Sequence, residues 1–150
     1  MSITLNTLVI VTIIIGISYL IALTFLKKLR HKRELEAQKL LKEEEIIYQI
    51  SAANSFGQTS LGHSQVRGTG TLIFSNKRIF FLMWLPKKEL SIPISSIQKI
   101  ETPKTHLGKT KLRKLLKVHF INEKKEPDSI AWMVENLEEA KKKLESLWQE

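Results

Sequence analysis

An apolar run over residues 3–26 constrains the fold of this 150-residue chain more than any other feature. The run contains no charged side chain and stops abruptly at a basic segment, residues 27–33, with the sequence KKLRHKR. A helix rises by about 1.5 Å per residue, so a helix of this length spans the roughly 30 Å hydrocarbon core of a bilayer. We therefore expect residues 1–26 to form a transmembrane helix that places the rest of the chain beside a membrane.

The position of the run near residue 1 also fits a cleaved signal peptide, but three features favour a retained anchor. Met1 and Ser2 carry no basic side chain, the run is longer than the usual apolar region of a signal peptide, and no small-x-small cleavage site precedes the basic segment. Its apolar side chains also cover every side of a helix, which suits lipid better than a protein core. Because all nearby basic residues follow the run, we expect the N-terminus outside and residues 27–150 in the cytosol, at the plasma membrane if the protein is bacterial.

Composition limits what the rest of the chain can be. It is long enough for one domain with one hydrophobic core. The chain has no Cys, which excludes disulfides, thiolate metal sites and cysteine nucleophiles and agrees with a reducing compartment. Its 24 Lys and Arg residues against 15 Asp and Glu residues give a formal net charge of +9. An anionic cytoplasmic leaflet attracts such an excess, by about 1 kcal/mol for each basic residue near the surface; nucleic acid is the other polyanion to consider.

Residues 27–45 are expected to extend the helix beyond the membrane as a basic juxtamembrane spacer. Residues 34–45 are almost entirely strong helix formers and include no Gly or Pro. A coiled coil is the alternative, but the leucines do not sustain a heptad over several turns. We expect a solvated spacer whose first residues grip anionic headgroups, namely Lys27, Lys28, Arg30, Lys32 and Arg33.

Short strand signals separated by turn residues repeat between residues 46 and 134. The segment 80–85 is apolar on both strand faces, and we expect its second face to be hidden by the terminal helix, by a partner or by the bilayer. Pro93 cannot donate to a β ladder, which predicts a sheet edge or a bulge at that position. The expected strands are residues 46–52, 70–74, 78–85, 90–95, 97–101, 115–121 and 129–134, with a polar loop over residues 54–64.

The C-terminal residues 135–149 return to helical periodicity. Acidic side chains in the first turns are followed by lysines, which is the order that the helix dipole favours. The apolar face consists of Leu137, Ala140, Leu144, Leu147 and Trp148, and we expect it to close an open end of the β-structure. The expected fold class is therefore α+β, mostly β: a transmembrane helix (1–26), a helical spacer (27–45) and a small antiparallel barrel or sandwich capped by a helix (46–150).

Three strings within residues 46–150 carry a resemblance to a known family. They are residues 70–81 (GTLIFSNKRIFF), which look like a strand-turn-strand pattern; residues 92–101 (IPISSIQKIE); and Trp132 with the terminal helix. Together they resemble the GRAM domain and the wider pleckstrin-homology-like (PH-like) superfold. The resemblance implies a PH-like barrel and a binding or adaptor module at membranes, without catalytic residues. Phosphoinositide recognition is not implied, because the loop at residues 55–66 lacks the Lys/Arg pair of phosphoinositide-binding relatives.

A second basic segment follows the strand expected at residues 97–101. Pro103, Gly108 and several threonines mark a hairpin loop, whose exposed tip lets charged side chains reach phosphate groups. We expect this loop to contact anionic phospholipid headgroups, because the anchor holds it near their surface. An ordinary solvated loop is the alternative. The basic residues of this segment are Lys104, Lys109, Lys111, Arg113, Lys114 and Lys117.

The sequence shows no pattern typical of a catalytic or metal site. The four histidines lie far apart and form no H-x-x-x-H or H-x-E motif. Asp128 is the only Asp, and neither a Gly-rich phosphate loop nor a nucleophile elbow occurs. The aromatic residues lie in apolar segments without interleaved Arg or Lys, which disfavours nucleic acid as a partner.

Taken together, these patterns predict a non-catalytic membrane protein without a metal or cofactor. Its cytosolic domain is expected to contact anionic lipid headgroups or a protein partner at the membrane. The alternative is a structural or assembly protein that acts through protein contacts of the domain or the spacer, with lipid incidental.

Overall fold

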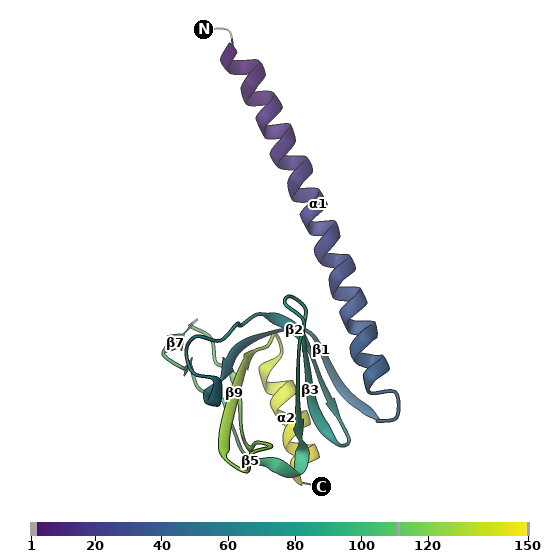
Figure 1. Cartoon of the computed structure of the whole chain (residues 1–150), viewed down its shortest axis with the longest axis vertical. Helices are drawn as coiled ribbons and strands as arrows, with labels where there is room; N and C mark the ends of the chain where they lie inside the picture. The colour runs from purple at the N-terminus through teal and green to yellow at the C-terminus, as the bar shows by residue number, and fades with distance from the viewer. Residues whose placement is uncertain (1–2, 111, 150) are drawn as a thin grey trace.

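One uninterrupted helix, α1 (Ile3–Leu40), contains the apolar run and the basic segment that follows it (Figure 1). The structure, a computed structural model, describes residues 3–110 and 112–149. Large apolar side chains from Leu8 to Leu26 are exposed along this helix, and α1 is long and apolar enough to cross a membrane by length and composition. Beyond Leu40 the chain turns, with the Glu44 amide donating to the Leu41 carbonyl oxygen, and enters the sheet. The helix predicted for the spacer is confirmed as far as Leu40.

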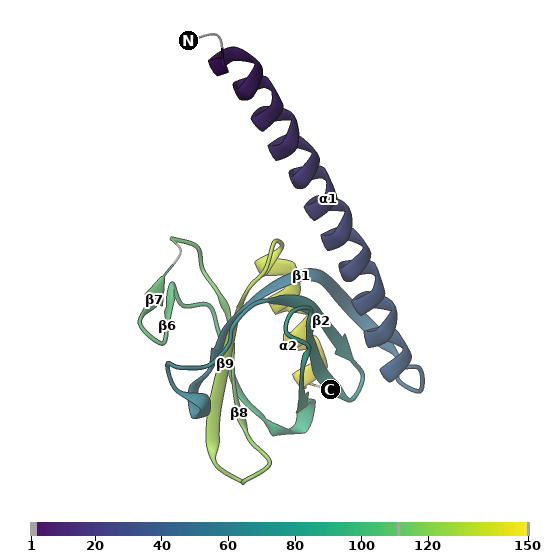
Figure 2. The same cartoon turned by 45° about the horizontal axis from the view of Figure 1, so that its top comes forward.

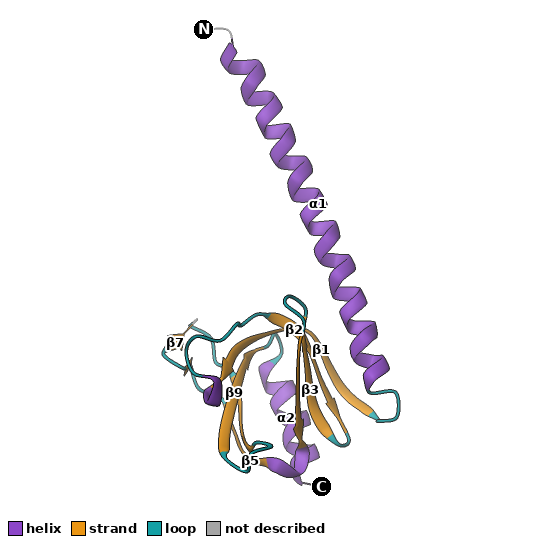
Figure 3. Ribbon diagram, in the orientation of Figure 1, coloured by secondary structure: helices purple, strands orange, loops and turns teal. Residues whose placement is uncertain are grey.

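Seven antiparallel strands form one curled sheet with the order β4-β3-β2-β1-β9-β8-β5 (Figure 3). Their bounds are β1 (Ile46–Gln58), β2 (Thr69–Ser75), β3 (Arg78–Met83), β4 (Lys88–Pro93), β5 (Ile97–Glu101), β8 (Leu116–Ile121) and β9 (Pro127–Met133). Single 3-10 turns, η1 (Thr59–Leu61) and η2 (Ile94–Ser96), follow β1 and β4. Between β5 and β8, β6 (Thr105–His106) and β7 (Lys109–Thr110) make a separate two-stranded ribbon. The chain ends in α2 (Leu137–Gln149).

The β1 strand is longer than the sequence predicted, and it bends the sheet. The segment predicted as a polar loop from residue 54 instead stays in β1 as far as Gln58. The first part of β1 pairs with β2 and the last part with β9, and the register shifts between Ile50 and Ala53 and again between Ser55 and Gln58. Such irregularities increase the local twist of a strand, so the sheet curls round on itself (Figure 2).

The edge predicted at Pro93 is confirmed. Pro93 lies in β4, which is an outer strand of the seven-stranded sheet, opposite Arg78 of β3. An outer strand has one side without a neighbour, so a residue that lacks an amide proton is tolerated there. The chain then crosses through η2 to β5, the strand at the other edge of the sheet.

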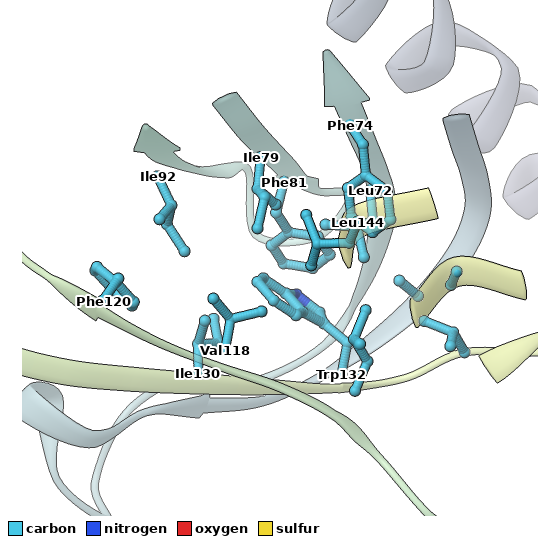
Figure 4. Close-up of a cluster of buried hydrophobic side chains, with 14 of the residues drawn as sticks. Leu72, Phe74, Ile79, Phe81, Ile92, Val118, Phe120, Ile130, Trp132 and Leu144 are labelled. Atoms are coloured by element: carbon cyan, nitrogen blue, oxygen red, sulfur yellow. The ribbon is translucent and has the colours of Figure 1, made fainter. Parts of the chain in front are cut away.

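The concave side of the sheet holds the main hydrophobic core (Figure 4). Trp132 of β9 is fully buried, and its ring lies 5.9 Å from the ring of Phe81 of β3 at an interplanar angle of 59°. This tilted arrangement is one that aromatic pairs prefer. Side chains from all seven strands of the sheet belong to this core, among them Leu72, Phe74, Ile79, Ile92, Val118, Phe120 and Ile130.

The amphipathic face of α2 closes this core, as the sequence predicted. Ala140 and Leu144 are fully buried in the core, and Leu137 and Leu147 pack against its edge. Trp148 remains partly exposed, and its indole Nε1 donates a hydrogen bond of 3.1 Å to the Ile97 carbonyl oxygen. The helix is therefore fixed both by apolar burial and by a bond to the start of β5.

The convex side of β2 and β3 is covered by the end of α1. Ala37 and Leu41 are 0% and 1% exposed and pack on Ile73, Phe80 and Leu82. The hidden second face predicted for the segment 80–85 is confirmed for Phe80 and Leu82, but the predicted cover was wrong: the end of α1 covers this face, and not the terminal helix, a partner or the bilayer. The prediction of a solvated spacer was wrong for these residues. Side chains four residues apart lie on the same side of a helical segment, so Ala37 and Leu41 can both contact the sheet. This short contact packs the end of α1 on the sheet without a heptad repeat.

Candidate functional site

In the basic segment of α1, the three lysines are exposed and the two arginines form ion pairs or hydrogen bonds. Lys27, Lys28 and Lys32 are exposed, and none of the three makes an ion pair with the rest of the described chain. Arg30 Nε lies 2.9 Å from Glu34 Oε1, one turn further along the helix. Arg33 is largely buried: its Nη1 lies 2.6 Å from Glu36 Oε2, and its Nε donates to the Trp84 carbonyl oxygen at 3.3 Å. Three of the five predicted residues are thus available to an anion next to the apolar run.

Two carboxylates, one in α1 and one in the turn that follows it, bind the sheet on either side of the dock, the apolar contact of Ala37 and Leu41 with β2 and β3. Glu36 accepts hydrogen bonds from Lys87 and Arg33, which lower the pKa of its carboxyl group. Glu44 lies 2.6 Å from Arg78 Nη2 through Oε1 and accepts a hydrogen bond from the Ser75 hydroxyl through Oε2. Although burial opposes them, the hydrogen bonds from Ser75 and Arg78 leave the pKa of Glu44 below its usual value. These pairs hold α1 and the sheet in one relative orientation.

The loop between β5 and β8 carries the second basic segment. Lys104, Lys109, Arg113 and Lys114 are exposed, whereas Lys111 lies outside the described residues. Leu112, which the sequence analysis did not single out, is 93% exposed at this tip. The signal that could have identified it is a lone leucine between basic residues in a segment with turn composition.

Lys117 is separated from this set by an ion pair. Its Nζ lies 3.0 Å from Glu101 Oε1 across the β5–β8 pair, and its side chain is mostly buried. Lys99 and His119 also contact this carboxylate, each at 2.8 Å. Hydrogen bonds from Lys99, His119 and Lys117 lower the pKa of Glu101 to about 2. Lys117 therefore balances a charge within the sheet rather than projecting towards a ligand.

The base of the loop is anchored, so the basic tip projects from a fixed position. His106 is buried, and its Nε2 lies 2.8 Å from the Gly57 carbonyl oxygen. Burial lowers the pKa of His106, which favours the neutral ring with the proton on Nε2 as donor to that oxygen. Leu115 is fully buried, and its amide donates to the Pro103 carbonyl oxygen at 2.8 Å.

The fold brings the two basic segments to the same side of the molecule. In Figures 1 and 2 the β6–β7 ribbon lies at the end of the domain that faces the apolar part of α1, and the turn between β8 and β9 lies at the opposite end. The turn between β3 and β4 also belongs to the first end, because Trp84 and Lys87 in that turn contact Arg33 and Glu36 of α1. Segments far apart in sequence therefore form one basic end of the domain.

Buried Asp128 is engaged in structural hydrogen bonds, whereas Nε and Nη2 of Arg67 and Nε1 of Trp132 are buried without a hydrogen-bond partner in the described residues. Asp128 accepts hydrogen bonds from the Gln58 side chain and the Ser60 amide at 2.6 and 3.0 Å, which ties η1 to β9. A nearby cavity of about 110 Å³ is lined mainly by side chains of β1, β3, β4 and the segment after η1, among them Ser55, Phe81 and Met83. In the parts of the chain that the structure describes, no group of three or more His, Asp or Glu side chains is arranged to hold a metal ion.

Comparison with known proteins reveals similarity of fold. No protein-family model matches the chain, and no curated protein matches it in sequence. The C-terminal domain of an unknown protein from Leishmania infantum is 14% identical, with a TM-score of 0.57 over 77% of this chain and 94% of that chain. A chain of the 8S snRNP assembly intermediate is 11% identical, with a TM-score of 0.55 over 69% of this chain and 82% of that chain. At these identities the similarity establishes a shared α+β fold.

Proposed function

We propose that this protein is a non-catalytic single-pass membrane protein whose GRAM/PH-like domain contacts anionic lipid headgroups, or a protein partner, at the cytosolic face. One observation carries the proposal: α1 is exposed and apolar over its first part, while its last turns are buried against the sheet. An apolar surface of this extent needs lipid or a partner to cover it. A span by the first part of α1 supplies that cover and leaves the domain beside the bilayer.

The distribution of charge supports lipid as the contact. Lys27, Lys28 and Lys32 follow the apolar run directly, where phosphate groups of a leaflet would lie. The exposed basic loop belongs to the same end of the domain. Because positive charge flanks the run on its C-terminal side alone, the domain is assigned to the cytosolic side and the N-terminus to the outside.

The chemistry of the domain supports a binding role. Its buried Asp128 and His106 are committed to hydrogen bonds that join strands and loops. Glu101 pairs with Lys117 and contacts His119 on the β5–β8 pair. These groups stabilise the fold, and the exposed basic side chains are left as the means of recognition.

Single-cysteine labelling of the full-length protein tests the proposal, because the natural chain has no Cys. Ser2→Cys is expected to react with a membrane-impermeant maleimide in intact cells. Lys124→Cys, in the exposed turn between β8 and β9, is expected to react only after the membrane is permeabilised. Labelling of Lys124→Cys in intact cells, or release of the protein from membranes by alkaline carbonate, contradicts the proposal.

A further inference from the structure

The tip of the β5–β8 loop combines one exposed leucine with basic side chains. Leu112 is 93% exposed and is followed by Arg113 and Lys114, with Lys109 on the other side of the tip. No acidic residue occurs in the sequence between Glu101 and Glu123, so the segment has a single sign of charge. An apolar side chain among cations is the composition that interfacial membrane segments use.

The turn between β3 and β4, beside α1, also exposes a leucine close to lysines. Leu85 is 66% exposed and is followed after Pro86 by Lys87 and Lys88. The turn is held in place, since the Trp84 carbonyl oxygen accepts a hydrogen bond from Arg33 and its indole Nε1 donates one of 3.0 Å to the Thr71 hydroxyl. Its orientation relative to α1 is therefore fixed.

Both tips belong to the end of the domain from which the apolar part of α1 rises (Figures 1 and 2). The dock formed by Ala37 and Leu41, with the ion pair between Glu36 and Lys87, sets this arrangement. When the apolar part of α1 crosses a bilayer, the two tips face the leaflet that the helix leaves. Lys87 is paired with Glu36 and Glu89, but the positive charge of Lys88 and of the β5–β8 loop is complementary to the anionic lipids of a cytoplasmic leaflet.

We propose that these tips form a second membrane contact, in which Leu112 and Leu85 insert at the headgroup boundary of an anionic bilayer while Lys109, Arg113 and Lys114 bind its phosphates. The inference rests on the proposed function, because α1 has to span the same bilayer. A free phosphate would engage the cations but leave both leucines in water, so the combination selects a lipid surface. With this contact the domain lies directly on the lipid surface, in addition to being anchored through α1; we call this state seating.

Labels at matched positions of the full-length protein test this seating. Leu112→Cys, in the loop between β7 and β8, and Lys124→Cys, in the turn between β8 and β9, each place one environment-sensitive NBD fluorophore on an exposed side chain. The proteins are reconstituted into phosphatidylcholine vesicles with or without phosphatidylserine. We expect blue-shifted, stronger emission for the label at position 112 in phosphatidylserine vesicles and water-like emission for the label at position 124.

Charge variants define the role of the cations. In the Leu112→Cys background, neutralising Lys114 to Gln should lower the equilibrium constant for seating about fivefold, and Arg113→Gln should act similarly. Lys143→Gln, an exposed lysine of α2, is the control and should have no effect. Equal emission at position 112 with and without phosphatidylserine, or no response to Lys114→Gln, overturns the inference.

A third label separates failure of this inference from failure of the proposed function. Leu20→Cys carries the fluorophore within the C-terminal third of the apolar run and should report an apolar environment in every vesicle. Lipid-like emission at position 20 with water-like emission at position 112 overturns the second contact and leaves the proposed function standing. Water-like emission at position 20 overturns both.

Discussion

The carboxylate of Glu101 offsets the repulsion between neighbouring lysines of β5 and β8. Glu101 binds Lys99, Lys117 and His119 of β5 and β8, so two lysines that would repel one another are held around one carboxylate. The pKa of Glu101 is about 2 in the folded protein, below the usual carboxyl value of 4.5, because the cations stabilise its ionised form. A folded-state pKa below the unfolded one means that this stabilisation is present above about pH 4.5 and lost as the pH falls towards 2.

Glu101→Gln tests that balance. The variant should lower the free energy of unfolding at neutral pH by about 1 kcal/mol, because the side chain is partly exposed and solvent screens the ion pairs. It should also flatten the loss of stability between pH 4.5 and 2, measured by chemical denaturation with tryptophan fluorescence in detergent micelles. Glu123→Gln, in the exposed β8–β9 turn, is the control. An acid profile of Glu101→Gln identical to that of the wild type would falsify the assignment.

Gly70 shows a second constraint at the scale of one residue. A Cβ at this position would collide with the Leu82 backbone on the neighbouring strand β3 and with the Phe81 ring. Gly70→Ala should therefore destabilise the domain by about 1–3 kcal/mol through displaced strands or off-rotamer side chains. Gly16→Ala meets no atom within 4 Å and serves as the control. Equal thermal unfolding of the two variants would contradict this steric argument.

The last turns of the segment that was predicted to be a solvated spacer pack against the sheet. Ala37 and Leu41 complete a small second core with Ile73, Phe80 and Leu82 on the convex side of the sheet. The same strands send Leu72, Phe81 and neighbouring side chains into the main core. β2 and β3 are therefore buried on both faces, which is why they read as nearly continuous apolar runs.

Two adjacent leucines, one at the last residue of α1 and one directly after it, provide a matched test of the packing between α1 and the sheet. Leu41→Ala should lower the free energy of unfolding by about 2–3 kcal/mol, since it leaves a cavity between the helix and β3. Leu40→Ala, at a side chain that is 47% exposed, should change it by less than about 0.5 kcal/mol. Denaturant titrations in micelles measure both. Similar values for the two variants would show that α1 does not dock as described.

Much of this arrangement could be predicted from the sequence, because the spacing of apolar residues along a strand or helix follows the face that is buried. Alternation and turn residues located the strands, and the spacing of Leu137, Ala140 and Leu144 located the closing helix and its buried face. The length of β1 was missed because Asn54, Ser55 and Gly57 have low strand propensity, and pairing with β9 overrides it. The engagement of Lys117 by Glu101 was missed because ion pairs across strands leave no periodic signal.

At the scale of the whole molecule, the domain is incomplete without the last turns of α1. A fragment of residues 46–150 would expose Ile73, Phe80 and Leu82 and should self-associate or adsorb to any lipid. A fragment of residues 34–150 retains Ala37 and Leu41 and should be monomeric. Size-exclusion chromatography with light scattering distinguishes them. A monodisperse 46–150 fragment with the unfolding midpoint of 34–150 would contradict the expected role of the dock.

The continuity of α1 has a mechanical consequence. Residues 17–41 contain neither Gly nor Pro, and the helix runs unbroken from the apolar run to the dock on β2 and β3. A helix that tilts to match the thickness of its bilayer therefore turns the sheet through the same angle. On the proposed function, in which the first part of α1 spans a bilayer, α1 and the domain tilt together as one rigid body, so the position of the β5–β8 loop relative to the headgroups changes with the thickness of the membrane.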